Sequence, residues 1–370
     1  MTKRAGRAPT RTRHFRCAAR TIRPPHERYR RGAIARRGLA ALALACLSPV
    51  PAAAQAKLFQ QDSVLAVTLR TDLRSLLGDR DTSRQGVWRD ATLSYGDSAS
   101  PTTVPLRVRT RGIWRRSNCD YPPVLLRFND SLARGTVFHG VHRAKLVVPC
   151  QDGDEYEQLI LQEYAIYRVL QLLTPASLAT RLLRITYVDE RGKKKTFTRY
   201  SFVTEEPDRL AARLDGTVIT VGRPRVGNLS PYQAALLGTF QYFIGNTDWS
   251  MPARHNMVVM MAEDSAYAVP YDFDWSGAVD APYAVPLRVL PIKSVRERMW
   301  RGICQDTAQL APILSRFEAL RDTITALYHA TPGLQPRSIQ RTISYYDDFY
   351  KEIADRDHFV KHVVRRDCRL

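Results

Sequence analysis

The feature that most constrains the fold is a change of hydrophobic period along the chain. Before residue 206, short segments such as "VLAVTLRTD" from Val64 and "RLLRITYVDE" from Arg181 alternate apolar with polar residues, as half-buried strands do. After residue 290, in "TAQLAPILSRFEALRDTITALYHA" and in the segment from Pro336, the apolar residues recur at helical spacing. A strand-rich half before a helical half predicts an α+β protein with a boundary near Glu206.

One expected helix in the first half carries a carboxylate among apolar residues. Residues 154–173 form an amphipathic pattern in which Glu163 falls on an aliphatic stripe made of Leu159, Ile166, Leu170 and Leu173. A carboxylate in a core is costly unless it is paired. We therefore expect a cation to face Glu163.

The positive charge is concentrated at the N-terminus. The first 56 residues hold 13 Lys and Arg and a single acid, Glu27, so they carry +12 of the formal net charge of +20. Further along, Lys193, Lys194 and Lys195 follow "DERG", which favours a solvated hairpin tip over a phosphate-binding patch. We expect no nucleic-acid partner.

The same N-terminal stretch has the pattern of an export signal. Arginines precede an apolar run over residues 38–47 and small residues suited to cleavage after Ala54 or Ala56. We predict a signal peptide with a basic leader over residues 1–56, and a mature protein that is periplasmic, on the cell surface or secreted. A lipoprotein cleavage before Cys46 is the alternative. The apolar run is too short for a stable anchor, so we expect no transmembrane span in the mature chain.

Four cysteines follow this leader. In an exported protein they can form two disulfides in three connectivities. We expect Cys119 to pair with Cys150 and Cys304 with Cys368. Buried free thiols are the alternative.

Four polar side chains interrupt apolar segments in the middle of the chain. Asp248 follows a long expected helix, Asn256 directly precedes "MVVMM", and Asp272 and Asp274 stand at the end of "AYAVPYDFD". A hairpin with its turn at residues 262–265 would place Asn256 within about one residue of Asp272 across the pair. Oxygen ligands placed together suit a hard cation such as Mg²⁺, although single residues of these types commonly cap turns.

These motifs resemble the CotH kinase family, the spore-coat-protein-H-like secretory kinases. The matching segments are "GNTDW", "HNMVV" and "VPYDFDWSG", preceded by "RTRGIWRRSNCDYPPVLLRF", "RAKLVVPCQD" and "SFVTEEPDRL". The resemblance implies a two-lobed atypical protein-kinase-like fold, with a β-rich N-lobe over residues 57–206 and a mainly helical C-lobe over residues 207–370. It also implies ATP as co-substrate and Mg²⁺ or Mn²⁺ as cofactor.

The resemblance also implies roles for the site residues. Asp248 would be the catalytic aspartate, and Asn256 with Asp272 or Asp274 would bind the metal. Asp274 precedes "WSG" and so looks more like the aspartate of a DFG element, but the choice between the two aspartates stays open.

For the nucleotide, the resemblance implies that Lys145 holds the phosphates and that Glu163 pairs with Lys145. One departure concerns the phosphate cover, because no Gly-x-Gly-x-x-Gly precedes Lys145. The loop over residues 111–118, which contains the basic pair Arg115 and Arg116, would have to supply that cover.

Three functions are compatible with these residues. The first is an exported Mg²⁺-dependent phosphotransferase that moves the γ-phosphoryl group of ATP to a hydroxyl of a protein or envelope molecule. The second is a catalytically inactive, pseudokinase-like binding or coat and envelope assembly module, which the missing glycines favour. The third is a hydrolase or glycosyltransferase in which Asp272 and Asp274 hold a metal.

Overall fold

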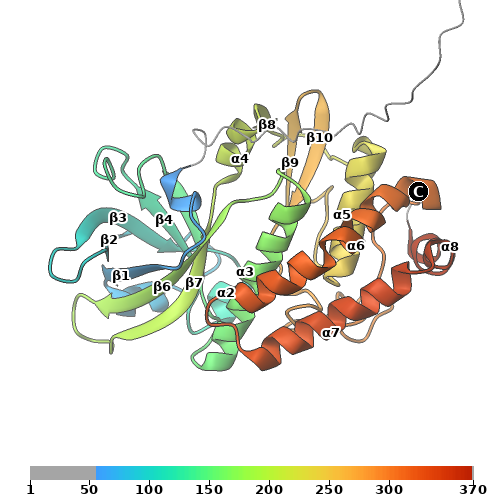
Figure 1. Cartoon of the computed structure of the whole chain (residues 1–370). Coiled ribbons are helices and arrows are strands. Elements are labelled where there is room, and N and C mark those ends of the chain that lie inside the picture. The colour runs from blue at the N-terminus through green and yellow to red at the C-terminus, as the bar shows by residue number, and fades with distance from the viewer. Residues whose placement is uncertain (1–55, 369–370) are drawn as a thin grey trace, which may run out of the picture. The chain divides into compact units, whose positions relative to one another are not determined.

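Seven β-strands close into a barrel in the first half of the described chain (Figure 1). The structure, a computed structural model, describes residues 56–368, which all belong to one compact unit, Pro49–Leu370. The strands follow the order β1-β2-β3-β4-β5-β7-β6 around the barrel. Their bounds are β1 (Leu65–Thr71), β2 (Arg89–Tyr95), β3 (Thr102–Thr110), β4 (Val124–Phe128), β5 (Arg143–Val147), β6 (Thr180–Asp189) and β7 (Phe197–Thr204).

The closed barrel contradicts the predicted fold class. We expected a two-lobed kinase-like fold, and that prediction is wrong because β1 pairs both with β2 and, in parallel, with β6. The parallel register places Leu65 opposite Leu183 and Thr71 opposite Asp189. Alternating hydrophobicity fixes which face of a strand is buried, but it does not say which strand covers each edge.

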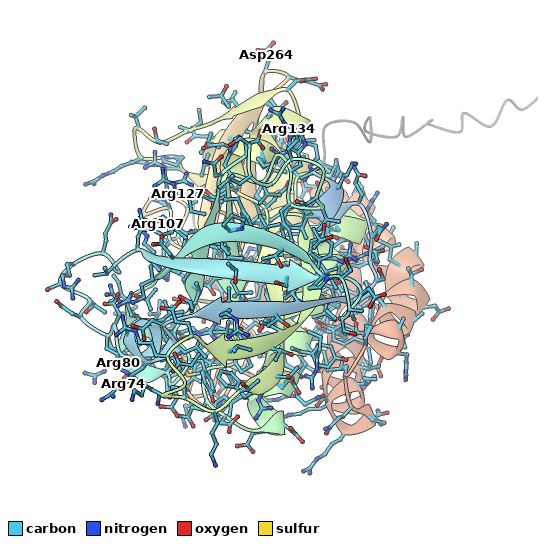
Figure 2. The ribbon with its side chains drawn as sticks, turned by 90° about the vertical axis from the view of Figure 1, so that its left-hand side faces the viewer. Arg74, Arg80, Arg107, Arg127, Arg134 and Asp264 are labelled. Carbon is cyan, nitrogen blue, oxygen red and sulfur yellow. A yellow bond between two sulfur atoms is a disulfide. The ribbon has the colours of Figure 1, made fainter. Side chains whose placement is uncertain are left out.

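Side chains alternate between the barrel interior and solvent. In β3, Val104, Leu106 and Val108 are buried, whereas Arg107 is exposed. Arg107 lies opposite Arg127 of β4, and Figure 2 shows both side chains on the outer surface. The interior is therefore an apolar core of aliphatic and aromatic side chains, and the outer face of β3 and β4 presents arginine side chains to solvent.

A second core lies among the helices. Helix α3 contacts β7, α6 and α7, so it joins the barrel to the C-terminal helices. Helix α5 begins after a serine cap, where Ser230 accepts a hydrogen bond from the Gln233 N–H and Pro231 occupies the first turn. The helices are α1 (Leu73–Leu77), α2 (Trp114–Asn118), α3 (Asp154–Leu173), α4 (Pro207–Arg213), α5 (Pro231–Phe243), α6 (Thr307–Ala330), α7 (Pro336–Ile353), α8 (Arg356–Phe359) and α9 (Arg365–Asp367), with 3₁₀ turns at Lys57–Phe59 and Val226–Asn228 and a π turn at Val360–Val364.

The predicted hairpin in the middle of the chain is confirmed. Strands β9 (Met257–Ala262) and β10 (Ser265–Pro270) pair antiparallel, with Ala262 opposite Ser265, and β8 (Gly216–Val218) pairs with the other edge of β9. The two turn residues, Glu263 and Asp264, both have positive φ, as a type I′ turn requires. This register brings the start of β9 beside the end of β10.

Both predicted disulfides are present. Cys119 is bonded to Cys150 and Cys304 to Cys368, which indicates an oxidising, exported environment. The predicted signal peptide, apart from Ala56, lies outside the described residues. Within residues 56–368, no helix is both long and apolar enough to cross a membrane.

Candidate functional site

The site begins where helix α5 ends. Gly245 has φ of +64°, and a Cβ at this position would lie 1.9 Å from the Tyr345 hydroxyl, so only glycine fits. The next residues form a loop whose ends are joined by backbone hydrogen bonds in both directions between Ser250 and His255. Asp248 lies two residues before Ser250, where the chain enters this loop.

Asp248 is oriented by two neighbouring side chains. Its Oδ1 lies 2.9 Å from His255 Nε2, and its Oδ2 accepts a hydrogen bond of 3.0 Å from the Asn256 amide. The same amide nitrogen donates to the backbone oxygen of Asp248, which leaves the Asn256 carbonyl oxygen for another contact. Sequence reasoning gave His255 no role, because only the folded loop brings it to Asp248.

Asn256 and Asp272 lie at the two ends of the hairpin, as predicted. The Tyr271 N–H donates to the main-chain carbonyl oxygen of Asn256, not to its side-chain oxygen, and this bond continues the ladder by one residue. Asn256 and Asp272 have φ of +52° and +65°, an unfavourable region for non-glycine residues. Such strain persists where the surroundings enforce it, and it is concentrated at functional sites.

Asp274 is the most deeply buried of the four predicted residues. It is 4% exposed, accepts a hydrogen bond of 3.0 Å from the Tyr283 hydroxyl and lies 3.9 Å from Arg115 Nη1. Burial and the negative charge of Asp272 raise the pKa of Asp274 to about 7, although Arg115 acts against this.

Glu163 lies beneath the two aspartates. It is fully buried, and its Oε1 accepts a hydrogen bond of 3.3 Å from the backbone N–H of Phe273, the residue between them. Its Oε2 has no hydrogen-bond partner among the described residues. Burial and the charges of Asp274 and Asp272 raise the pKa of Glu163 well above its ordinary value.

Lys145 does not pair with Glu163. Among the ion pairs of residues 56–368, none joins these two side chains, and the cation near Glu163 is Arg115. Lys145 Nζ instead lies 4.4 Å from the centre of the Tyr271 ring. Burial and the nearby charge of Arg111 lower the pKa of Lys145 to about 8. Arg115, a residue of helix α2 that sequence spacing does not place there, acts on Glu163 through its charge, but among residues 56–368 no ion pair joins the two side chains.

A disulfide fixes the segment that carries Arg115. The Arg115 guanidinium donates to the Val148 carbonyl oxygen, and the Cys119 N–H donates to the Arg115 carbonyl oxygen at 2.9 Å. The Cys119–Cys150 bond ties the same two segments covalently. Arg115 is therefore held against the aspartates by the backbone on both sides.

These groups meet in one cavity of about 390 Å³. Neither Lys145 nor Glu163 is among its lining residues within the described chain. Its rim includes exposed apolar side chains, among them Ile113, Trp114 and Leu287. The charged and amide residues that line it are Arg111, Arg115, Asp248, His255, Asn256, Asp272 and Asp274.

The carboxylates of the site, Asp272, Asp274 and Glu163, outnumber the cations close to them. Within residues 56–368, no group of three or more His, Cys, Asp or Glu side chains already has the arrangement of a metal site. Even so, Arg115 is the cation that acts on both Asp274 and Glu163, Asp272 is also near Lys145, and Glu163 keeps an unpaired buried oxygen. Oxygen-rich, negatively charged surroundings of this kind fit Mg²⁺ or Mn²⁺.

Comparisons with known proteins do not extend these observations. No protein-family model and no curated protein matches the chain. The resemblance to CotH kinases therefore stays a prediction from the motifs, and function has to be argued from the geometry of this cavity.

Proposed function

We propose that the protein is an exported, divalent-metal-dependent phosphotransferase that moves the γ-phosphoryl group of ATP to a hydroxyl of a protein or envelope molecule. The observation that carries this proposal is the cavity that Asp248 lines together with Asp272, the buried Asp274 and two arginines, Arg111 and Arg115. Carboxylates for a metal, cations for phosphate and an oriented aspartate are the parts that phosphoryl transfer uses. The motifs that resemble CotH kinases include Asp248, Asn256, Asp272 and Asp274, but the Lys145–Glu163 pair that the resemblance implied is not among the ion pairs of residues 56–368.

Asp248 is the residue placed to receive the proton. In the proposed reaction, the acceptor hydroxyl oxygen forms a bond to the γ-phosphorus while the bond from that phosphorus to the β,γ-bridging oxygen breaks. ADP leaves, and the hydroxyl proton passes to the Asp248 carboxylate. His255 and Asn256 hold that carboxylate in one orientation, so they act as positioning residues.

Asp272, Asp274 and the Asn256 carbonyl oxygen would hold the metal, which supplies charge neutralisation for the phosphates. Arg111 and Arg115 line the same cavity and would contact phosphate oxygens. Lys145 lies behind Tyr271 and contributes positive potential without lining the cavity. The exposed apolar rim at Ile113 and Trp114 would contact the nucleotide base.

The test is transfer of label from γ-labelled ATP in the presence of Mg²⁺ or Mn²⁺. Asp248→Asn is expected to lower the rate at least ~100-fold, because a positioned general base contributes about 10²–10⁴-fold. Asp264→Asn is the matched control, since Asp264 lies exposed in the turn of the same hairpin (Figure 2) and should transfer normally. Equal labelling of wild type and Asp248→Asn would exclude the proposed role of Asp248.

A binding module without catalysis is the second candidate. One observation favours a binding module. Among the described residues, no group of three or more His, Cys, Asp or Glu side chains is already arranged to hold a metal. Stabilisation of the wild type by ATP and Mg²⁺ without any transfer of label would support it over the phosphotransferase.

A further inference from the structure

Three arginines stand in register on the outer face of the barrel. Arg107 of β3 lies opposite Arg127 of β4, which in turn lies opposite Arg143 of β5. All three are exposed, and Figure 2 shows Arg107 and Arg127 on the outer surface. Directly opposite residues have Cβ atoms about 5 Å apart, and like charges in such a pair destabilise the sheet. An anion bound between the arginines would relieve this repulsion.

The outer two arginines of this row have acidic partners, but the middle one does not. Arg107 Nε lies 3.3 Å from Asp90 Oδ1, and Arg143 Nη2 lies 3.2 Å from Glu206 Oε2. Among the ion pairs of residues 56–368, none involves Arg127. The uncompensated positive charge of the row is therefore at its centre.

The positive charge continues along β3 towards the candidate site. Arg109 and Arg111 follow Arg107 at every second position, and strand residues at this spacing share a face. Successive side chains on that face are about 7 Å apart. Arg111 lies one residue past the end of β3 and lines the cavity that Asp248 also lines. The arginine strip defined in this way consists of Arg107, Arg109, Arg111, Arg127 and Arg143.

Acidic residues limit the width of the arginine strip. Asp90 of β2 lies opposite Arg107 on one side, and Glu206, just after β7, pairs with Arg143 on the other side. The three strands between these carboxylates, β3, β4 and β5, are neighbours about 5 Å apart. An anionic membrane surface would bring its headgroups against both carboxylates as well. One extended chain fits between them.

The aromatic ring beside the arginine strip is already in contact with cations. The guanidinium groups of Arg109 and Arg127 lie 4.7 Å and 5.8 Å from the centre of the Trp88 ring. A sugar ring would have to displace them to stack on this indole. An extended peptide needs no such platform, and its side chains on one face repeat at about 7 Å, the spacing expected along β3.

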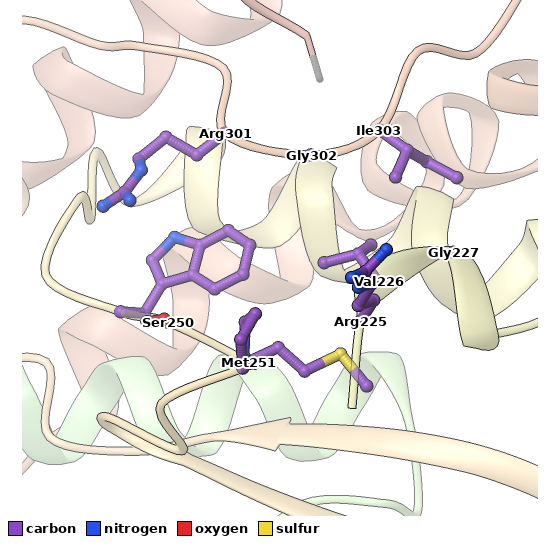
Figure 3. A pocket seen from close by; sticks show the side chains of 10 residues that line it. Arg225, Val226, Gly227, Ser250, Met251, Arg301, Gly302 and Ile303 are labelled. Carbon is purple, nitrogen blue, oxygen red and sulfur yellow. The ribbon is translucent and has the colours of Figure 1, made fainter. Parts of the chain in front are cut away.

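A second pair of arginines, shown in Figure 3, differs from the arginine strip. Arg225 and Arg301 come from different segments that line one hollow. The Arg301 guanidinium donates to the Thr247 carbonyl oxygen. Among the residues that line this hollow in the described chain, Arg225 is the one exposed cation. An anionic partner therefore meets more positive charge on the barrel than in this hollow.

We propose that the arginine strip binds an acidic segment of a partner protein, in extended conformation and with carboxylates at alternate positions. These carboxylates pair with Arg107 and Arg109 along β3 and with the uncompensated Arg127 beside them. Because the arginine strip ends at the cavity that Asp248 lines, the segment is also a candidate acceptor, and that extension alone rests on the proposed phosphotransferase. Binding and transfer are measured separately, so either can fail without the other.

Fluorescence anisotropy of the wild-type protein with a labelled peptide of five Asp-Ser repeats tests this surface. We expect saturable binding in low salt, and a loss of at least ~10-fold in affinity in about 0.5 M NaCl, because exposed charges are screened. A peptide of five Asn-Ser repeats should not bind. Absence of saturable binding by the Asp-Ser peptide, or equal binding of the Asn-Ser peptide, would overturn the proposal.

Polygalacturonate and vesicles that contain phosphatidylglycerol represent the competing partners. Each should displace the labelled peptide only at a higher concentration of negative charge than the unlabelled Asp-Ser peptide requires. If either of them displaces it at a lower concentration, a polysaccharide or a membrane surface is the better partner and the proposal is wrong.

Substitution of one exposed arginine locates the binding. Arg127→Gln removes the uncompensated charge and is expected to weaken peptide binding about 5-fold, whereas Arg127→Lys should keep more of the affinity. Arg74→Gln is the matched control, because it removes the same charge from an exposed residue of helix α1 that Figure 2 shows apart from Arg127. Unchanged affinity in Arg127→Gln, or an equal loss in Arg74→Gln, would exclude the arginine strip as the binding surface.

Discussion

Two adjacent arginines of helix α2, Arg115 and Arg116, belong to two ionic clusters that differ in how far their charges are paired. Arg116 and Arg115 are both buried, yet Arg116 faces Asp79 beside the barrel, whereas Arg115 faces the carboxylates of the candidate site. Arg115 and Arg116 are neighbours in the chain, but their side chains lie in two different ionic environments.

The Asp79 cluster is fully compensated. Asp79 Oδ1 accepts a hydrogen bond of 2.5 Å from Arg116, and its Oδ2 accepts bonds from the Val87 N–H and from Arg89. Burial acts to raise the pKa of Asp79, but these hydrogen bonds outweigh it and hold the pKa below its ordinary value. Nothing is left for a ligand to supply.

The cluster around Asp274 is not compensated. Asp272, Asp274 and Glu163 share Arg115, whose closest approach to Asp274 is 3.9 Å. A buried surplus of negative charge is unfavourable unless a cation joins it. The two clusters therefore differ in the charge that remains unpaired, not in the types of residue that form them.

The largest expected effect separates the two arginines. Arg116→Met leaves Asp79 buried without its main partner, so the free energy of unfolding should fall by about 3–5 kcal/mol. Arg115→Met also leaves unpaired carboxylates, but Mg²⁺ is expected to restore much of its stability. Urea denaturation with and without Mg²⁺ measures both. If Mg²⁺ stabilised both variants equally, the claim that only the cluster around Asp274 can bind Mg²⁺ would be wrong.

The two disulfides should differ in what they support. Replacing Cys119 and Cys150 with serine is expected to cost about 3–4 kcal/mol by the loop-entropy estimate, and replacing Cys304 and Cys368 about 4 kcal/mol. Only the first pair holds Arg115 in place, so only its loss should weaken Mg²⁺-ATP binding. Calorimetry on both double variants provides the readout, with each serving as the control for the other. Equal loss of nucleotide binding would show that stability alone is responsible.

Removal of one carboxylate should have opposite consequences in the two clusters. Asp79→Asn loses charge-assisted hydrogen bonds and is expected to destabilise the protein by about 1–3 kcal/mol near neutral pH. Asp274→Asn reduces a charge surplus, so in the presence of EDTA its stability should equal or exceed that of the wild type. Urea denaturation in EDTA compares them directly. A similar destabilisation in both variants would contradict the assignment of a surplus.

The smallest effect is the pH dependence of the Asp79 contribution. Since the folded-state pKa of Asp79 lies below its unfolded value near ~3.9, its stabilisation is complete above that pH and is lost as the pH falls through the folded-state pKa. The stability difference between wild type and Asp79→Asn should therefore narrow below about pH 4. A difference that stays constant from neutral to acid pH would show that Asp79 is not stabilised as a carboxylate.

Local features of this molecule were predictable, and distant pairings were not. The hairpin turn follows from its turn residues, and four cysteines after the leader predicted two disulfides, although their number left three connectivities open. Barrel closure was not predictable, because the parallel pairing of β1 with β6 joins strands more than a hundred residues apart.

In the candidate site, too, contacts between residues close in the sequence were predictable and contacts between distant segments were not. Asp248 and Asn256 lie close in sequence, and their contact follows from the loop and the hairpin register. Arg115, however, reaches Asp274 from a segment about 160 residues earlier, and Lys145 is held over Tyr271 by the fold of the barrel. The sequence pattern indicated that Glu163 needs a cation, but only the tertiary structure identifies Arg115.

Binding of Mn²⁺, followed by electron paramagnetic resonance, tests most directly whether the uncompensated cluster is a metal site. Wild type and Asp79→Asn should each bind Mn²⁺ saturably, and Asp274→Asn should bind it at least ~10-fold more weakly because a ligand and a charge are removed. Absence of saturable Mn²⁺ binding by the wild type, or binding by Asp274→Asn with unchanged affinity, would contradict the metal site.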